Sequence, residues 1–204
     1  MNTAHGDFVP AAGHHWLLPL YDPFLRLFTR EKRWRGRILD SLDMRPGDVL
    51  VDVGCGTGSL ALMAKEGVPH ASIIGVDPDR KALAKAEAKA RRKNLSLELH
   101  TGFGSDSARL VGAGRADKVV SSLAFHHMPA EMQAQTLSSI WQALKPGGLL
   151  RIADFASGSH LPGPTGRLAA DVAAAGFENV RTLGGFRVAF ADVTLVGAEK
   201  PHGV

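Results

Sequence analysis

A short apolar run followed by three closely spaced glycines is the part of the sequence best suited to bind a cofactor. Residues 49–53 read as a buried strand, and Gly54, Gly56 and Gly58 follow it. Glycine lets backbone N–H groups approach a ligand closely, and the N-terminus of the next helix favours a carboxylate or phosphate. The following β-rich run ends at Asp77, whose carboxylate can accept hydrogen bonds from both hydroxyls of a ribose. Because open α/β sheets bind nucleotides at such a turn, we expect a nucleotide-containing cofactor.

The spacing of the glycines argues against a nicotinamide dinucleotide. The fingerprint G-x-G-x-x-G would place its third glycine at position 59, which is Ser59. A short-chain dehydrogenase also needs a tyrosine with a lysine at the fourth position after it. The single tyrosine is Tyr21, and Leu25 stands at that position. Hydride transfer is therefore disfavoured.

The elements around the glycine turn follow the order of an α/β domain. Short β-rich runs alternate with longer helical patterns, which indicates a parallel sheet with helices on its faces. The expected strands are 49–53, 71–76, 95–101, 118–123, 149–153, 179–183 and 193–198, and the expected helices are 59–66, 78–93, 129–144 and 167–175. The last two strands are close enough in sequence to pair as a hairpin. Apolar positions between residues 16 and 42 predict further helices that lie on this domain.

Composition indicates one globular domain without disulfides. The chain has 204 residues, 45% of them apolar and 22% charged, and its single cysteine is Cys55. A chain of this length can bury a core without a disulfide or a structural metal. The sequence holds no apolar run long enough to span a membrane, and its start lacks the pattern of a signal peptide, so we expect a cytoplasmic protein.

The nine histidines do not predict a metal site. Two pairs, His14–His15 and His126–His127, consist of adjacent residues. Adjacent residues share neither a helix face nor a strand face, so neither pair forms a ready ligand set. We therefore expect no metal.

Four motifs resemble those of the class I S-adenosylmethionine-dependent methyltransferases. The glycine turn with Asp77 resembles the first motif of that family, and residues 116–128 look like its fourth-strand motif. Residues 144–150, with the sequence LKPGGLL, look like the motif that leads into the fifth strand. Leu20-Tyr21-Asp22 fits an N-terminal motif of one subgroup. That subgroup, methyltransferase type 11, includes ubiquinone and menaquinone C-methyltransferases and bacterial phospholipid N-methyltransferases.

The resemblance implies a specific fold. It is a three-layer Rossmann-like α/β sandwich with N-terminal helices and a seven-stranded, mostly parallel sheet. The expected strand order is 3-2-1-4-5-7-6, with strand seven antiparallel. Residues 1–45 would form a helical segment that covers the active site, and residues 46–204 the methyltransferase domain.

The resemblance also implies a cofactor and the residues that bind it. The cofactor is S-adenosylmethionine, which becomes S-adenosylhomocysteine on methyl transfer. In the family, the residue at Asp52 orients the methionine amino group, Gly54 and Gly56 give close backbone approach, and Asp77 holds the ribose. The expected cofactor-binding set further includes Gly58, Pro78, Phe103, Gly104, Ser122 and Leu123.

The residue that contacts adenine is less well defined. Family members usually carry a Gly-Asp pair after the third strand, whereas here Gly102 is followed by Phe103. Asp106 is one substitute, from farther along the chain. The alternative is that Phe103 packs on the adenine with Gly104 nearby, and we favour this second interpretation.

His126 and Tyr21 are the candidate catalytic residues. Methyl transfer is an in-line displacement in which orientation of the nucleophile supplies much of the acceleration, so a base is optional. If a base is used, His126 or His127 is best placed, because an imidazole can accept a proton near neutral pH. Alternatively, both histidines are structural and pack the helix that begins near Pro129. Tyr21 would lie near the methyl sulfonium, where an aromatic face attracts a cation, or would only anchor the first helix.

The acceptor is expected to be a small or lipophilic molecule. Basic residues crowd positions 26–37 beside Trp16, Phe24 and Phe28, which suits an anionic membrane surface or a lipophilic acceptor. The alternative is that the apolar side packs on the domain while the arginines are solvated. Quinone methyltransferases of the family carry a long helical insertion after the fifth strand, and residues 155–165 are only a brief loop. A quinone is therefore not favoured by the resemblance.

The sequence disfavours two other subgroups of methyltransferases and leaves one further function open. Methyltransferases that act on nucleic-acid bases carry an Asn/Asp-Pro-Pro-aromatic motif where this chain has Ser121-Ser122-Leu123-Ala124, so no nucleic acid is expected. Arsenite methyltransferases need several cysteines and are excluded. A cofactor-binding scaffold or inactive partner subunit would keep the same glycine turn, and the sequence does not exclude it.

Asp154, at the end of the fifth strand, could contact an acceptor or act through a neighbour. The sequence does not indicate the oligomeric state.

Overall fold

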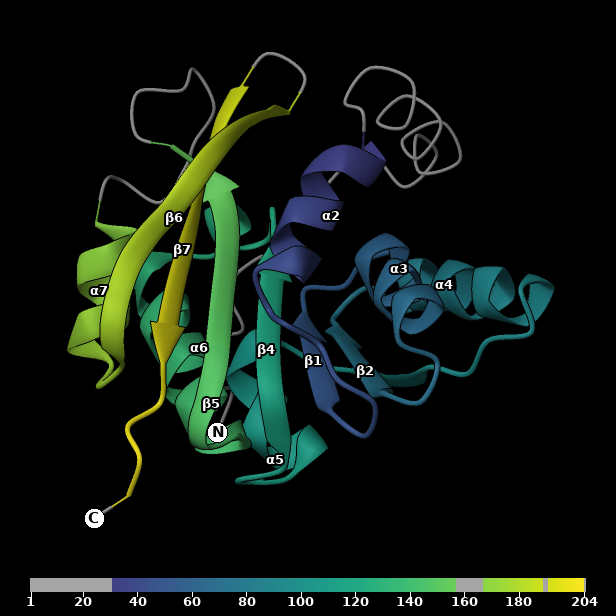
Figure 1. Ribbon diagram of the computed structural model, residues 1–204, viewed down its shortest axis with the longest axis horizontal. Coiled ribbons are helices and arrows are strands. Elements are labelled where there is room, and N and C mark those ends of the chain that lie inside the picture. Colours follow the sequence, from purple (N-terminus) through teal and green to yellow (C-terminus); the bar gives the residue numbers. More distant parts are fainter. Residues whose placement is uncertain (1–30, 157–166, 189–190, 204) are drawn as a thin grey trace, which may run out of the picture.

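The sheet has the order that the resemblance implies. The computed structural model describes residues 31–156, 167–188 and 191–203. In these ranges its strands are β1 (Val49–Val53), β2 (Ser72–Asp77), β3 (Glu98–Thr101), β4 (Ala116–Ser122), β5 (Leu144–Phe155), β6 (Glu178–Val188) and β7 (Ala191–Glu199). They form one sheet in the order β3-β2-β1-β4-β5-β7-β6 (Figure 1). β1 to β5 pair in parallel, and β7 is antiparallel to both β5 and β6.

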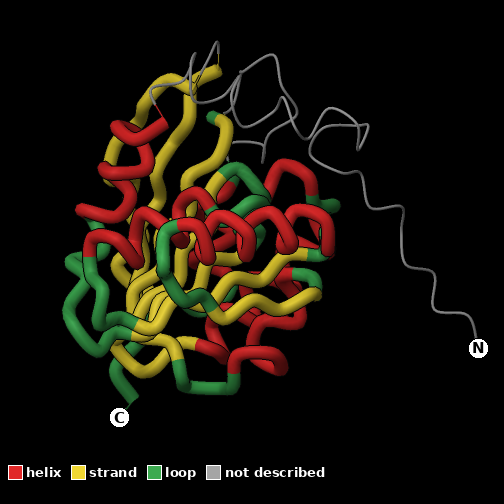
Figure 2. Tube along the Cα trace, turned by 90° about the vertical axis from the view of Figure 1, so that its right-hand side faces the viewer, coloured by secondary structure: helices red, strands yellow, loops and turns green. Residues whose placement is uncertain are grey.

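Helices cover both faces of the sheet. The described helices are α2 (Glu31–Asp40), α3 (Ser59–Gly67), α4 (Arg80–Arg92), α5 (Ser107–Val111), α6 (Ala130–Ala143) and α7 (Leu168–Ala174), with two short 3-10 turns, η2 (Gly104–Asp106) and η3 (Phe125–His127). α2, α3 and α4 lie on one face and α5, α6 and α7 on the other (Figure 1). In the side view of Figure 2 the strands pass between helical segments, so the chain has the three-layer arrangement. No helix in the described ranges is long and apolar enough to cross a membrane.

Alternation along the buried strands divides the core into two halves. Successive side chains of a strand point to opposite faces. Leu50 of β1 therefore packs with Trp34 and Ile38 of α2, whereas Val51 packs with Leu137 and other residues of the opposite layer. Since α2 contributes fully buried residues to one half of the core, its burial makes it an integral layer of the fold. The expected boundary at residue 45 stays a prediction.

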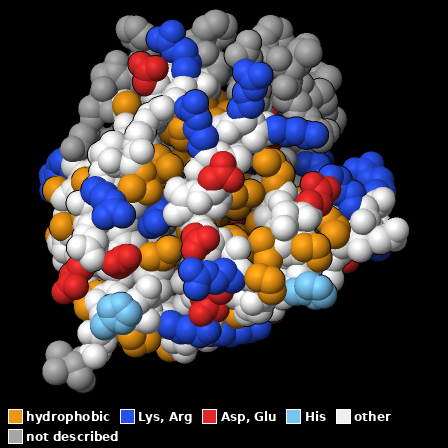
Figure 3. Space-filling model, in the orientation of Figure 1, with side chains coloured by type: hydrophobic (Ala, Val, Ile, Leu, Met, Phe, Trp, Pro, Cys, Tyr) orange, Lys and Arg blue, Asp and Glu red, His pale blue; other side chains and the backbone are white. Residues whose placement is uncertain are grey.

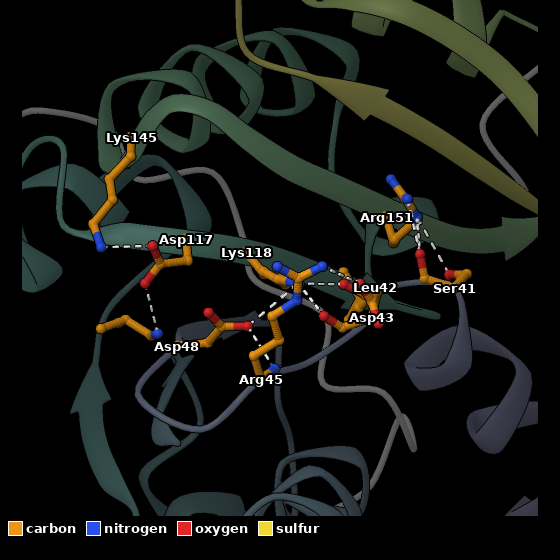
Figure 4. Close-up of polar contacts among 10 residues, drawn as sticks. Ser41, Leu42, Asp43, Arg45, Asp48, Asp117, Lys118, Lys145 and Arg151 are labelled. Carbon is orange, nitrogen blue, oxygen red and sulfur yellow. Dashed lines mark hydrogen bonds and ion pairs between the residues drawn. The ribbon is translucent and has the colours of Figure 1, made fainter. Parts of the chain in front are cut away.

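Two buried cations fix the carboxyl end of α2 to the sheet (Figure 4). Nζ of Lys118, on β4, donates to the carbonyl oxygens of Leu42 and Asp43 and lies 3.3 Å from the carboxylate of Asp48. Arg151, on β5, donates to the carbonyl oxygen of Ser41 at 2.8 Å. Carbonyl groups at the end of a helix lack partners within the helix, and cations satisfy them. These bonds hold the carboxyl end of α2 in a fixed position on the sheet.

The structure corrects several expected boundaries. α4 begins at Arg80 and not at Pro78, because the side chain of Asp79 caps the helix by accepting from the amides of Lys81 and Ala82. The connection expected before β4 contains η2 and α5. β5 begins at Leu144 and includes the Pro-Gly-Gly turn, since Gly147 and Gly148 exchange backbone hydrogen bonds of 2.9 Å with Lys200.

Candidate cofactor site

Three left-handed glycines shape the turn between β1 and α3. Gly54, Gly56 and Gly58 have φ values of 74°, 53° and 73°. Such values are costly for residues with a Cβ atom. The N–H of Gly54 donates to the carbonyl oxygen of Val76 at 2.8 Å, and that of Gly58 donates to Cys55 at 2.9 Å. The turn is therefore attached to β2 and closed on itself before α3 begins.

The three glycines have different surroundings. A Cβ atom on Gly54 would lie 2.4 Å from Cβ of Ala124, and one on Gly58 would lie 2.8 Å from Cβ of Ala86. Among the described residues, no atom lies within 4 Å of a Cβ placed on Gly56. Gly54 and Gly58 thus allow the protein to pack on itself, whereas Gly56 faces open space. Gly56 is the residue at which a ligand can approach the backbone.

Asp77, at the end of β2, binds the backbone of the glycine turn through its side chain. Its Oδ2 accepts from the N–H of Gly56 at 2.7 Å, and its Oδ1 accepts from the N–H of Asp79 at 2.9 Å. Burial raises the pKa of this carboxyl, and the two amide hydrogen bonds oppose the rise. Each carboxylate oxygen keeps a further lone pair that can accept from a ligand hydroxyl.

Asp52 presents a buried oxygen without a partner. The residue is 1% exposed, and its Oδ1 has no hydrogen-bond partner among the described residues. Burial raises the pKa of Asp52 to about 7, although the charge of Arg35 opposes this rise and that of Asp77 adds to it. An unpaired buried carboxylate is unfavourable, and a ligand cation would satisfy it. The methionine ammonium of S-adenosylmethionine fits this donor-poor position.

The carboxyl end of β4 completes the edge of the site. Ser122 Oγ accepts a 3.2 Å hydrogen bond from Arg35 of α2. Leu123 has φ of 56°, a conformation that is rare for a branched residue, and its N–H donates to Ala153 at 2.8 Å. Backbone strain of this kind is concentrated at functional sites. The expected residues Ser122 and Leu123 therefore lie beside the end of β1, to which β4 is paired.

The structure shows the surroundings of Asp106 and Phe103, the two residues expected as possible contacts of the adenine. The carboxylate of Asp106 accepts from the N–H of Phe103 at 3.0 Å and from Arg109 at 2.9 Å, so it caps the turn of η2. Phe103 is half-buried, and its role as an adenine platform stays a prediction. A Cβ atom on Gly104 would lie 2.6 Å from Thr136 of α6, so the absence of a side chain there serves helix packing.

His126 and Asp154 form a buried pair at the carboxyl ends of β4 and β5. Nδ1 of His126 lies 2.8 Å from Oδ1 of Asp154, and the His126 N–H donates to Oδ2 at 3.2 Å. The side chain of His126 is 9% exposed and that of Asp154 is 0% exposed. A carboxylate that accepts from Nδ1–H leaves Nε2 of a neutral ring free to accept a proton. This is the arrangement that a general base needs.

His127 is unsuited to carry charge. Its ring centroid lies 3.9 Å from that of His126. Burial lowers the pKa of His127 to about 4, and the neighbouring His126 adds to this effect. Within the described ranges, no group of three or more His, Cys, Asp or Glu side chains is arranged to hold a metal ion.

Two residues of the site were not among the expected cofactor-binding or catalytic residues. In the sequence Arg35 is one of several residues in a basic run, and no partner for Asp154 is evident. A Glu-to-Arg spacing of four at Glu31 and Arg35 is the one local signal, because such pairs meet on a helix. The contacts of Arg35 with Ser122 and of Asp154 with His126 join residues far apart in sequence. Tyr21, with the rest of residues 1–30, lies outside the described residues.

Comparisons with known proteins identify a methyltransferase domain in this chain. The profile of a methyltransferase domain family matches residues 50–148. The chain is 34% identical over 143 residues to a demethylmenaquinone methyltransferase of Thermus thermophilus, covering 68% of this chain and 62% of the relative. It is 31% identical to the enzyme of that name from Lactobacillus johnsonii, covering 66% and 55%. The chain thus spans less than two thirds of the length of these relatives.

Solved structures share the fold at low sequence identity. The [4+2]-cyclase SpnF superposes with a TM-score of 0.72 at 19% identity, covering 84% of this chain and 81% of the other. A phosphoethanolamine N-methyltransferase 2 from Haemonchus contortus, solved with phosphomonomethylethanolamine and S-adenosylhomocysteine, gives 0.70 at 16% identity, covering 83% and 53%. The methyltransferase domain over residues 50–148 and the demethylmenaquinone methyltransferase relatives support a class I S-adenosylmethionine-dependent methyltransferase, including its menaquinone-type subgroup.

Proposed function

We propose that this protein transfers a methyl group from S-adenosylmethionine to a small or lipophilic acceptor by in-line displacement. The observation that carries the proposal is the juxtaposition of Gly56, Asp77 and Asp52. Gly56 faces open space, Asp77 ties that turn to β2, and Asp52 presents a buried oxygen without a partner. These groups suit backbone approach, a ribose and an ammonium group, respectively.

The reaction itself needs little covalent help from the protein. S-adenosylmethionine, when bound, supplies a methyl group on a positively charged sulfur, which is reactive towards a nucleophile. The chain's residues bind, orient and exclude water, and correct orientation alone can contribute up to about 10 kcal/mol to catalysis. The described part of the site is built on strand ends and on the fixed helix α2, so it is well suited to this role.

His126 is the proposed base. Asp154 accepts from Nδ1–H and so leaves Nε2, on the other side of the ring, available to take a proton from an acceptor. Phe155 packs at 4.6 Å between ring centroids and limits rotation of the imidazole. Asp154 acts through His126 and is therefore a positioning residue. The proposed role of Tyr21 beside the methyl group rests on the family resemblance.

The class of acceptor rests on relatives and on surface chemistry. The curated relatives are named for demethylmenaquinone and one structural neighbour for phosphoethanolamine, which are a lipophilic and a small polar acceptor. Lys32, Arg33 and Arg37 are exposed on α2, and Figure 3 shows basic side chains over this part of the surface. They permit contact with an anionic membrane surface. Such contact, and a cytoplasmic location, stay predictions.

A scaffold without turnover is the alternative. The fold alone does not show whether the chain transfers a methyl group, because a [4+2]-cyclase has the same fold. The test is formation of S-adenosylhomocysteine by the full chain, measured by mass spectrometry with a reduced naphthoquinone, phosphoethanolamine and a set of phenols. Acceptor-dependent product supports methyl transfer. Tight cofactor binding without product from any of these acceptors supports the scaffold.

A further inference from the structure

A row of apolar side chains begins beside His126 and crosses three strands of the sheet. The His126 ring packs on that of Phe155, with 4.6 Å between the ring centroids. In the sheet register Phe155 of β5 is opposite Val193 of β7, and Val193 is opposite Phe186 of β6. Side chains that are directly opposite on antiparallel strands point to the same face of a sheet. Phe155, Val193 and Phe186 therefore form one row, which we call the apolar strip.

Helix α2 bounds the far end of the apolar strip. The ring of Trp34 stacks on that of Phe186, with 5.5 Å between centroids and 17° between ring planes. Trp34 and Val193 are buried, whereas Phe155 and Phe186 are half-buried, and all four belong to the same half of the core. Neighbouring strands are about 4.8 Å apart, so the two phenylalanines are about 10 Å apart with Val193 between them. A surface of this shape suits a flat ring system.

His126 places the proposed base at one end of the apolar strip. Asp154 and Phe155 are successive residues of β5 and point to opposite faces of the sheet, yet both contact the His126 ring. The imidazole therefore lies across the carboxyl end of β5, with Nδ1 on the carboxylate and its ring against the first residue of the strip. A molecule that lies on the strip has the imidazole beside it.

The chemistry of the strip selects among acceptors. None of its side chains is acidic, so it offers nothing to pair with an ammonium group. Its two aromatic rings favour an aromatic ligand, because stacked and edge-to-face contacts stabilise a ring pair beyond the area that they bury. An ordinary imidazole has a pKa of about 6.5 and a phenol one of about 10, whereas the pKa of an aliphatic hydroxyl is near that of water, about 16. An imidazole can therefore take the proton of a phenol far more readily than that of an aliphatic alcohol.

We propose that the acceptor is a phenol whose ring lies on the apolar strip and whose hydroxyl oxygen receives the methyl group. This inference rests on the proposed function and names the acceptor class of the same site. A bond forms between the hydroxyl oxygen and the methyl carbon. The bond from that carbon to sulfur breaks, and its electron pair stays on the sulfur, which becomes neutral. The hydroxyl proton passes to Nε2 of His126.

Calorimetric titration of the full chain, saturated with S-adenosylhomocysteine, tests the inference through binding alone. The ligands are 2-naphthol and decahydro-2-naphthol, which share a carbon skeleton and a hydroxyl group and differ in their aromatic rings. We expect 2-naphthol to bind at least about 10-fold more tightly. Phe186→Leu removes a ring and keeps an apolar side chain, so it should weaken binding of 2-naphthol about 3- to 10-fold and change that of the saturated alcohol little. Val180→Ala is the matched control, since Val180 lies in the same strand but packs in the opposite half of the core, and it should change neither affinity.

Product analysis identifies the atom that is methylated. With S-adenosylmethionine the full chain should convert 2-naphthol into its methyl ether, which NMR distinguishes from a ring-methylated naphthol. Equal affinity for the two ligands, unchanged affinity for 2-naphthol in Phe186→Leu, a ring-methylated product or no product from 2-naphthol would each overturn the inference. If Phe186→Leu does not fold, as judged by thermal unfolding, the ligand preference and the product of the unmodified protein decide.

The same measurements separate this inference from the proposed function. Methylation of phosphoethanolamine without methylation of 2-naphthol would overturn the phenol and leave methyl transfer intact. Failure of the unmodified protein to bind S-adenosylhomocysteine would instead reject the proposed function, and the inference with it.

Discussion

The backbone N–H of Gly56 donates a 2.7 Å hydrogen bond to the carboxylate of Asp77. This bond ties the open centre of the glycine turn to the end of β2. The oxygen that shapes the turn also keeps a lone pair, and in the proposed function this lone pair accepts from a ribose hydroxyl. Loss of its side chain should affect both the turn and the ligand.

Asp77→Ala is expected to weaken binding of S-adenosylhomocysteine by about 1 to 3 kcal/mol, through loss of charge-assisted hydrogen bonds. Calorimetric titration measures the change. Asp79→Ala is the matched control, since it removes the cap of α4 at a cost of about 1 kcal/mol in stability and leaves the ribose carboxylate in place. Equal affinities for Asp77→Ala and the unmodified protein would reject the ribose assignment.

Alanine substitutions should separate the packing glycines from the ligand-facing one. Gly54→Ala places Cβ 2.4 Å from Ala124 and should destabilise the fold by several kcal/mol. Gly56→Ala meets no described atom within 4 Å and should cost about 1 to 2 kcal/mol for its backbone conformation. Denaturant unfolding measures both. Gly56→Ala should also bind the cofactor more weakly, and unimpaired binding would mean that the ligand does not approach there.

Asp52 should make stability depend on pH. Its pKa is about 7 in the folded protein, above the ordinary value of an unfolded chain, so the folded state binds the extra proton. The free energy of unfolding should therefore fall as pH rises from about 4 to 7 and level off above. Asp52→Asn should lack this slope and be more stable at pH 8, by up to about 4 kcal/mol.

The same variant should lose cofactor affinity, because its amide cannot pair with an ammonium group. Urea unfolding at pH 5 and 8, with titration at pH 8, checks both expectations. A parallel pH slope in the two proteins would show that Asp52 is ionised throughout this range in the folded state.

His126→Ala should leave cofactor affinity unchanged and slow turnover about 100- to 10,000-fold if His126 is the base. Asp154→Asn keeps the shape of the pair but weakens the hold on Nδ1, so turnover should fall by less. Turnover of His126→Ala equal to that of the unmodified protein would remove the base from the mechanism.

Substitution of Lys118 should lower the free energy of unfolding more than substitution of an exposed lysine does. Lys118→Met leaves the carbonyl groups of Leu42 and Asp43 without this donor and removes the cation beside the carboxylate of Asp48, which should cost about 3 to 5 kcal/mol in denaturant unfolding. Lys145→Met removes a 2.6 Å pair with Asp117 whose lysine is 45% exposed, and should cost at most about 1 kcal/mol. Similar losses for the two variants would contradict the account of how α2 is fixed.

Elements with a strong local pattern could be predicted from the sequence. The β1 strand, the glycine turn and Asp77 lie within one stretch of chain. The apolar run, the closely spaced glycines and the acidic residue after the next strand together form a pattern that is typical of a nucleotide-binding turn. The structure places them together as expected, with Gly56 bonded to Asp77. The sheet order followed from the family resemblance, and it is confirmed.

Contacts between distant segments could not be predicted. Residue pairs such as His126 with Asp154, or Arg35 with Ser122, meet because parallel strands end at one edge of the sheet and α2 lies over it. Nothing in the spacing of these residues specifies their distance. Arg35 resembles its exposed neighbours in sequence, but its guanidinium lies over the ring of Trp34 and donates to Ser122, a residue far away in the chain.

Calorimetric titration of the full chain with S-adenosylmethionine, S-adenosylhomocysteine and NADH tests the central claim most directly, because it needs no acceptor. The account predicts micromolar binding of the first two ligands and none of NADH. Binding of NADH alone would contradict the assignment of the glycine turn, and binding of none of the three would contradict the claim that this site takes a nucleoside cofactor.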